Sequence, residues 1–421
     1  MSDDGPGTKD APALDEVMLD EVMPWSVPPL RLGRGWVAAP DAASLRGRWK
    51  ALVRSEDEAE RAALFGPSRS RTLHSAVAPL PGMPAHGGPL TLERGGCPEP
   101  VRILHGPFDQ QWLIPDHRLV DAARPQLWRV SDAHQTHLVE TAHDHRHPGP
   151  LFTFTALLPD GQAPVGRSGR IRPLYRRPGG REPNLLPGLL DHLAVRLGVR
   201  VTAEDVLAWT AAAARPGPRG RAVPLTSDPG LWRRGVELGR RVVRLHTRGA
   251  RCAGEENGGG RPRLPGGHRP YVRAPLPAAA PAAEELVHDP EERALHVGEG
   301  RVAPVAPEAW EYEAGGARVL EAWFGQRSVA PLDAGRLAAV RPGSWPQEWT
   351  SELLELITVL TLLSELREEQ RDLARSLESG GEPGRAGLEG AGLLPVPPAS
   401  RLPASVLDVP EEGPNGQLAL L

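Results

Sequence analysis

The sequence predicts a mixed α+β fold, with short strands in the first half, helices around them, and one long amphipathic helix near the C-terminal end. Three observations lead to this class. Residues 68–165 alternate short apolar runs with turn residues, a pattern typical of strands. After Asn184, apolar residues recur at helical spacing. From Trp349 to about Leu377 the same spacing persists, with Glu and Arg on the opposite face.

Length and composition limit the possible classes of protein. A chain of 421 residues, 40% of them apolar, can bury a sizeable core in two or three domains. Gly and Pro number 47 each, so we expect long loops between the folded parts. The two cysteines, Cys97 and Cys252, exclude a disulfide scaffold and a Cys₄ zinc site. Lys9 and Lys50 are the only lysines, and neither has the neighbours that a Walker A loop needs.

The first half of the chain predicts a helix followed by strands. Residues 1–30 are acidic and predict a disordered leader. A helical pattern covers Asp41 to Phe65 and is ended by Gly66-Pro67. Strands are expected at the apolar runs 101–104, 112–114, 128–130, 138–139 and 151–158.

The second half predicts a series of helices. Pro187 can occupy the first turn of a helix that Gly198 ends. Thr202 and Asp205 form a capping box for a second helix, and Pro229 follows the start of a third, which ends near residue 249. Later elements are expected as strands over 295–297 and 302–305 and as a helix over 317–324.

These elements divide the chain into five expected parts. They are a disordered leader (1–30), a helix with a strand-rich part (31–165), an Arg-rich α/β part (166–345), a packing helix (346–378) and a disordered tail (379–421). The N-terminus lacks the basic-then-apolar pattern of a signal peptide. The most apolar stretch, 353–366, contains two glutamates and is too short to cross a bilayer. We therefore expect a cytoplasmic protein without membrane contact.

Positive charge is concentrated in the middle of the chain. Between Gly161 and Pro275 there are 22 Arg and 8 Asp or Glu, a local net charge of +14, whereas the whole chain carries −4. A general excess of arginine does not explain this segregation. A basic block within an acidic protein favours a polyanion, such as nucleic acid, as the partner.

One Arg-rich segment, residues 166–181, alternates six arginines with glycines and one tyrosine. The guanidinium fork can donate paired hydrogen bonds to a phosphate, or to O6 and N7 of guanine. Glycines let the backbone approach closely, and the tyrosine could stack or hydrogen-bond. The predicted DNA contacts are Arg167, Arg170, Arg172, Tyr175, Arg176, Arg177 and Arg181. The alternative for this segment is a solvated loop without a partner.

The helix expected after Pro229 carries its basic residues on one side. At about 100° per residue, six arginines fall within an arc of about 120°, opposite the apolar residues. They are Arg233, Arg234, Arg240, Arg241, Arg244 and Arg248. Such a face could follow a duplex backbone, where contacts position a protein without reading its sequence. The alternative is an ordinary surface helix whose arginines extend over apolar neighbours.

Catalytic and metal-binding motifs are not apparent. Five histidines lie within fourteen residues: His134, His137, His143, His145 and His147. Histidines at such spacing can bind zinc, but the surrounding turn residues and the lack of a nearby cysteine favour a solvated loop. The chain has no G-x-S-x-G motif and no Asn/Asp-Pro-Pro-aromatic motif. We expect no catalytic residue, no metal and no cofactor, and an enzyme with an unfamiliar site remains as an alternative.

A dozen short strings between about residues 30 and 378 resemble, in order, the C-terminal specificity region of type ISP restriction–modification enzymes. These enzymes are single chains that join nuclease, helicase-like motor, methyltransferase and target-recognition parts. Among the strings are Pro107-Phe-Asp109, Phe152-Thr-Phe-Thr155, Leu245-His-Thr247, Trp310-Glu-Tyr-Glu313, Arg318-Val-Leu-Glu-Ala-Trp-Phe324 and Trp349-Thr-Ser-Glu-Leu-Leu354. This chain departs from the expected pattern at Gln110 and Gln111, where we expect a basic residue, although glutamine can read adenine.

The resemblance implies a target-recognition domain, which selects the DNA sequence on which a methyltransferase and a nuclease act. The family's nuclease, motor and methyl-transfer motifs are not in this sequence. The expected partners are therefore double-stranded DNA and a separate methyltransferase or nuclease and motor subunit. The alternative is a protein–protein interaction module whose arginines bind the acidic termini or an acidic partner instead of DNA.

Overall fold

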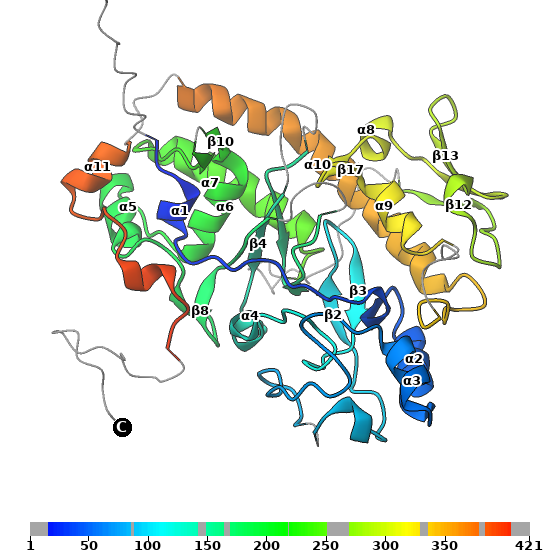
Figure 1. Ribbon diagram of the computed structural model, residues 1–421. Coiled ribbons are helices and arrows are strands. Elements are labelled where there is room, and N and C mark those ends of the chain that lie inside the picture. Colours follow the sequence, from blue (N-terminus) through cyan, green and yellow to red (C-terminus); the bar gives the residue numbers. More distant parts are fainter. Residues whose placement is uncertain are drawn as a thin grey trace, which may run out of the picture.

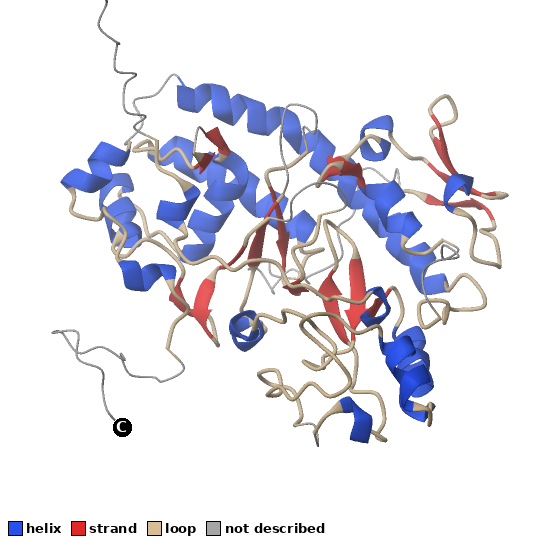
Figure 2. Ribbon diagram, viewed as in Figure 1, coloured by secondary structure: helices blue, strands red, loops and turns tan. Residues whose placement is uncertain are grey.

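The computed structural model describes residues 16–85, 88–141, 149–163, 169–217, 219–250, 269–328, 336–378 and 384–405. Within these residues the fold is α+β, as the sequence predicts (Figures 1 and 2). The long helix α10, Gln347–Glu378, crosses the molecule from lower right to upper left in Figure 1. In Figure 2 the central strands lie below the large helices and above a loop-rich lower part, and other strands lie at the upper right.

The first of two hydrophobic cores lies in a unit that we call the first lobe. Its elements are α2 (Ala42–Arg54), α3 (Glu58–Phe65), α4 (Pro125–Val130) and a sheet in the order β1 (Ala38–Ala39), β3 (Gln110–Leu113), β2 (Val101–Leu104) and β6 (Leu158–Pro159). Leu45, Trp49 and Leu52 recur at helical spacing on α2 and are buried in this core. The opposite face of α2 is left to solvent.

The second lobe holds most of the helices and the other core. Its helices are α1 (Leu19–Val22), α5 (Leu189–Leu197), α6 (Ala203–Ala213), α7 (Pro229–His246), α8 (Pro307–Trp310), α9 (Val319–Gly325), α10 and α11 (Arg385–Gly390). Four of its strands form a sheet in the order β12 (Tyr271–Ala274), β15 (Gly300–Ala303), β14 (Ala294–Val297) and β13 (Leu286–Asp289). The other strands form three hairpins: β8 (Tyr175–Arg177) with β9 (Arg181–Pro183), β10 (Arg215–Gly217) with β11 (Gly220–Ala222), and β16 (Glu313–Ala314) with β17 (Ala317–Arg318).

Glycine permits the close packing of α6 against α7. A Cβ added at Gly239 would lie 1.7 Å from the backbone oxygen of Ala208, and one added at Gly235 would lie 2.4 Å from the ring of Trp209. No side chain fits at those distances, so the two glycines let the helices approach. The stacked rings of Trp209 and Trp232, 4.9 Å apart, extend this contact.

A three-stranded sheet joins the two lobes. Its order is β5 (Phe152–Thr155), β4 (His137–Glu140) and β7 (Ile171–Pro173). Because side chains alternate across a strand, Leu138 of β4 packs into the core of the second lobe and Val139 into that of the first. The sheet crosses the boundary that we expected between residues 165 and 166, since β4 and β7 come from opposite sides of it.

Local patterns located most elements, but several predictions were wrong. The strand expected over 151–158 is two short strands, β5 and β6, in different sheets. The helix expected over 317–324 begins at Val319, and Pro187 precedes the first turn of α5. Thr202 and Asp205 form the predicted capping box, and Gly198 ends α5 in the left-handed conformation. The strand expected over 128–130 is wrong, because Pro125 starts the short helix α4 there. The pattern from Asp41 to Phe65 is two helices, since Asp57 caps a new one by accepting hydrogen bonds from the backbone of Ala59 and Glu60.

Both terminal parts are more ordered than the sequence suggested. The leader is folded from residue 16 onward, because apolar side chains between its acids, Val22 and Met23 among them, are fully buried in the second lobe. Its acids pair with distant arginines, as Glu21 does with Arg385 at 2.8 Å. The tail contains α11, whose Leu388 is fully buried. Residues 1–15, 379–383 and 406–421 lie outside the described residues.

Candidate nucleic-acid interface

The first Arg-rich segment forms β7, β8 and β9, and much of it is used inside the fold. Arg172 is buried in β7 and donates from Nε to Oε1 of Glu140 at 3.0 Å. Its two other nitrogens donate to the backbone oxygen of Met23 and to the carboxylate of Asp20. Arg172 therefore fastens the N-terminal segment to the central sheet and does not face solvent.

The neighbouring side chains also have partners within the chain. The Tyr175 hydroxyl donates to Glu204, and burial, together with this hydrogen bond, raises the pKa of Tyr175 above its usual value. Arg176 and Arg177 share the carboxylate of Glu182, at 2.6 and 2.7 Å.

Arg176 and Arg177 also hold the C-terminal segment. Arg176 donates to the backbone oxygens of Ala399 and Leu402, at 2.9 and 2.7 Å. Arg177 donates to the backbone oxygen of Ser405 at 2.9 Å. Together with Arg172, these arginines bind both terminal segments of their own chain, mostly through backbone oxygens.

Two predicted contacts of this segment face solvent. Arg170 is exposed and donates to the hydroxyl and backbone oxygens of Ser26, at 2.5 and 2.9 Å. Arg181 is exposed and donates to the backbone oxygen of Pro178 at 3.1 Å. Arg167 lies outside the described residues. From residue 169 to 181 the segment is thus neither a free solvated loop nor a continuous basic surface.

Helix α7 has the division of faces that its sequence predicts. Asp228 caps it by accepting from the backbone of Gly230 and Leu231. The apolar side is buried against α6 and α10. The exposed arginines define what we call the α7 arginine face: Arg233, Arg234, Arg240, Arg241 and Arg244.

The arginines of this face are weakly held. Arg240 pairs with Asp205 at 2.5 Å and Arg241 with Glu369 at 2.7 Å, and both guanidinium groups remain about half exposed or more. An exposed ion pair contributes only about 0–1 kcal/mol, so a phosphate can replace Glu369 at little cost. Asp205, in contrast, is buried and also caps α6. Arg234 and Arg244 have no ion-pair partner within the described part of the chain.

Arg248, predicted on the same face, lies elsewhere. It follows the end of α7 with a left-handed backbone (φ 53°). Its side chain turns inward and donates to the backbone oxygen of Phe108 at 3.0 Å, and burial lowers its pKa. The periodicity of a helix no longer applies past its last turn, which is why the sequence misplaced this residue.

Three of the strings that carry the family resemblance meet where the two lobes join. Phe108 packs against His246 and Tyr312, with ring centroids 4.7 and 5.8 Å away. Burial lowers the pKa of His246 to about 3, so this ring is neutral at pH 7. Strings far apart in sequence thus share one buried contact, and their role here is structural.

A buried ionic network lies beside these rings. Arg327 is fully buried and pairs with Asp109 at 2.9 Å and with Glu352 of α10 at 3.1 Å. Gln111, which we considered as a reader of adenine, is buried and donates to Asp109 at 2.7 Å. Gln110 is half-buried and accepts from Arg102 at 3.3 Å. The pair of glutamines therefore belongs to the joint between the lobes.

His105 and Asp160 form another ion pair near this joint. Burial acts to lower the pKa of His105, but the carboxylate of Asp160, 2.6 Å from Nδ1, outweighs burial and raises the pKa to about 9. The carboxylate of Asp160 also accepts from the backbone of Gly106 and Gln162. This pair holds the chain between β2 and β6.

The histidine-rich segment shows no metal geometry in its described part. His137 is buried in β4, with Nε2 3.1 Å from Oγ of Ser131. His143, His145 and His147 lie outside the described residues. A group elsewhere, formed by Asp289, Glu292 and His296, has the spacing of metal ligands. Its carboxylates are already used, since Asp289 caps a turn and Glu292 pairs with an arginine at 2.6 Å.

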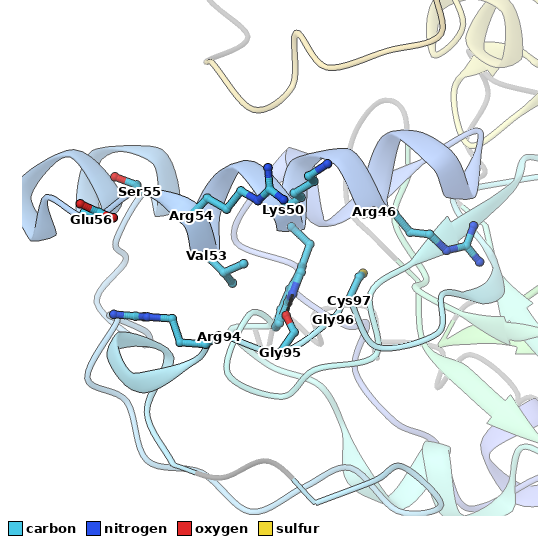
Figure 3. Close-up of a pocket in the computed structure, with 11 residues that line it drawn as sticks. Arg46, Lys50, Val53, Arg54, Ser55, Glu56, Arg94, Gly95, Gly96 and Cys97 are labelled. Atoms are coloured by element: carbon cyan, nitrogen blue, oxygen red, sulfur yellow. Dashed lines mark hydrogen bonds between the residues drawn. The ribbon is translucent and has the colours of Figure 1, made fainter.

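The structure also reveals a basic surface that our sequence analysis missed. Arg46, Lys50 and Arg54 lie on the solvent side of α2, beside a cavity of about 580 Å³ (Figure 3). The signal was present in the sequence, because Ala42–Arg54 contains basic residues at intervals of four and no acidic residue. A search for blocks of net charge overlooked it because the block is short.

No helix among the described residues has the length and apolar character needed to cross a membrane.

Comparisons with known proteins identify the family. Residues 21–356 match the family model of the type ISP C-terminal specificity domain, which is more than half of the chain. No curated protein shows significant similarity. The fold resembles the ATP-dependent type ISP restriction–modification enzyme LlaBIII bound to DNA, with a TM-score of 0.58, 12% identity, and coverage of 89% of this chain and 25% of that one.

Two further structures show the same fold. The DrdV–DNA complex gives a TM-score of 0.52 at 15% identity and covers 85% of this chain and 35% of that one. A nuclease-deletion mutant of the type ISP enzyme LlaGI, in complex with a DNA substrate mimic, gives a TM-score of 0.51 at 15% identity. This match covers 86% of this chain and 29% of that one. This chain thus spans about a quarter to a third of these enzymes. It belongs to the family of type ISP C-terminal specificity domains.

Proposed function

We propose that this protein recognises a target sequence in double-stranded DNA, and that the α7 arginine face lies along the DNA backbone. The observation that carries the proposal is this exposed row of arginines in a chain of the specificity-domain family. The solved structures of similar fold are complexes with DNA or a DNA mimic. Side chains near α7 would read the base pairs once the protein has bound the DNA backbone.

The proposed contacts are fewer than those expected from the sequence. Arg233, Arg234, Arg240, Arg241 and Arg244 would bind phosphates, and the exposed Arg170 and Arg181 would extend the surface. Arg172, Tyr175, Arg176, Arg177 and Arg248 have structural partners, and we assign them to positioning. Exchange of the exposed Glu369 carboxylate for a phosphate would make Arg241 available to DNA.

The chemistry on DNA would come from a partner. We propose that a methyltransferase, or a nuclease with a motor, acts on the sequence that this domain selects. The sequence of this chain contains none of the catalytic motifs that we sought. A co-purification of this protein with the type ISP catalytic parts, with and without duplex DNA, tests the partnership.

The test of DNA binding is a salt titration with a labelled duplex. A protein that neutralises phosphates loses affinity with a log–log slope of about −0.9 per contact. The double variant Arg233→Gln, Arg244→Gln loses two phosphate contacts, so its log–log slope should be shallower by about 1.8. The matched control is Arg196→Gln with Arg200→Gln, two exposed arginines in and after α5, which should bind like the wild type.

A flat salt response would contradict the proposal. So would equal losses in the α7 variant and in the control, because these would reflect overall charge alone. If the wild type shows no affinity for duplex DNA at low salt, the interaction-module alternative, with an acidic partner, takes its place.

A further inference from the structure

A groove with basic walls lies on the first lobe, far from α7. The cavity of about 580 Å³ is bounded on one side by α2 and on the other by the loop 94–97. Figure 3 shows Arg46, Lys50 and Arg54 spread along α2, with Arg94 and Gly95 on the loop opposite. All four basic residues line the groove, and its lining includes only one carboxylate, that of Glu56.

The charges along α2 are not explained by the stability of the fold. Like charges at i and i+4 destabilise a helix by about 0.2–0.5 kcal/mol per pair, and Arg46, Lys50 and Arg54 make two such pairs. Arg46 has a carboxylate partner, the exposed Glu99 at 2.6 Å. Lys50 and Arg54 have none among the described residues and are exposed. Arg48, in contrast, is buried and binds backbone oxygens of the core.

Both walls of the groove are held in place. The indole nitrogen of Trp49 on α2 donates to the backbone oxygen of Gly95 at 3.1 Å. Beneath the loop, the buried Arg61 donates to the backbone oxygens of Thr91 and Glu93, at 3.1 and 3.0 Å. A preorganised site binds with a smaller loss of conformational entropy than one that must form on binding.

The floor of the groove favours binding over catalysis. Gly96 has open space where a side chain would be, so a ligand can approach the backbone. Burial raises the pKa of the Cys97 thiol to about 12, so it is not a thiolate nucleophile at neutral pH. The buried side chains of Trp49 and Val53 form the apolar base of the groove.

We propose that this groove binds successive phosphates of one strand of a nucleic acid, as a second contact surface for the DNA that the proposed function requires. Arg46 and Arg54 are eight residues apart, which is about 12 Å along a helix. Phosphates of one strand advance by about 3.4 Å each along the duplex axis. Because successive phosphates also turn about the axis, they are farther apart than this rise. The row of cations can therefore contact more than one phosphate of a strand and is longer than one free phosphate needs.

The experiment compares Lys50→Gln with Arg54→Gln, made together, with the wild type and with the Arg196→Gln, Arg200→Gln control. Both pairs are exposed and lose the same charge, and α5 lies on the other side of the molecule from α2 in Figure 1. Duplex affinity is measured from about 50 to 200 mM salt. Hydrogen exchange of the peptides covering 46–54 and 94–97 is followed with duplex and, separately, with inorganic tripolyphosphate.

The groove variant should bind more weakly than the control, with a slope shallower by about 0.9 per lost contact. Its affinity deficit should shrink about tenfold across that salt range, and duplex should protect both peptides in the wild type. A groove variant that binds like the wild type, while the α7 variant is weakened, overturns this inference alone. Protection by tripolyphosphate without protection by duplex assigns the groove to free phosphate and overturns it too. A wild type without duplex affinity overturns both proposals.

Discussion

Arg327 provides the sharpest test of how the two lobes are joined. Its side chain is fully buried, pairs with Asp109 and Glu352, and donates to the backbone oxygen of Trp323 at 3.0 Å. Its guanidinium carbon also lies 3.9 Å from the centre of the Trp323 ring. Arg327→Met keeps much of the volume and removes the charge. Asp109 then remains buried without a cation, and Glu352 keeps only Arg102, at 2.8 Å.

The expected loss is large. Removing one partner of a buried ion pair costs about 3–5 kcal/mol, and the lost cation–π contact adds about 0.5–2 kcal/mol. Typical domains have a free energy of unfolding of about 5–15 kcal/mol, so Arg327→Met should remove a large part of it. The measurement is urea denaturation followed by tryptophan fluorescence, since Trp323 and Trp349 lie at this joint.

A second variant separates charge from shape. Adding Asp109→Asn and Glu352→Gln to Arg327→Met neutralises the two carboxylates that Arg327 paired with. We expect this triple variant to be more stable than the single one. The control is Arg318→Met, whose partners Glu311 and Glu321 are exposed, with an expected loss of about 0–1 kcal/mol. The reasoning is refuted if Arg327→Met loses no more than this control, or if the triple variant is no better than the single.

Three further predictions concern stability. Gly239→Ala should lower the free energy of unfolding by several kcal/mol, because its Cβ would overlap the backbone of α6. Leu388→Ala should cost about 2–5 kcal/mol, because α11 is packed into the core of the second lobe. The His105–Asp160 pair should contribute about 3 kcal/mol at pH 6. A folded-state pKa raised from 6.5 to about 9 stabilises the fold fully below pH 6.5, and this contribution disappears as the pH rises through 9.

Each of these has a direct check by denaturation. Gly325→Ala is the control for Gly239→Ala, since nothing lies within 4 Å of its added Cβ and helix propensity should improve. A Leu388→Ala variant as stable as the wild type would mean that α11 contributes nothing to the core. For His105→Gln, the difference from the wild type should narrow between pH 6 and pH 10, and a constant difference would disprove the linkage.

Some of the sites came directly from local sequence. The amphipathic pattern of α7 located its arginine face, and the capping residues located its start and the start of α6. These signals are local because hydrogen bonds of helices and caps connect residues three or four positions apart. The basic row on α2 has the same kind of signal, and a short-range charge count would have found it.

The role of the first Arg-rich segment was decided by tertiary structure. A guanidinium group is satisfied equally by a phosphate, by a carboxylate or by backbone oxygens, so composition cannot distinguish an external ligand from an internal one. The partners of Arg172 and Arg176 lie 152 and 226 residues away along the chain, at Asp20 and Leu402. The sequence by itself determined which segments are helical and where positive charge accumulates. Only the folded chain decided which of those arginines bind its own terminal segments and which face solvent. Contacts between residues far apart in the chain leave no periodic pattern in the sequence.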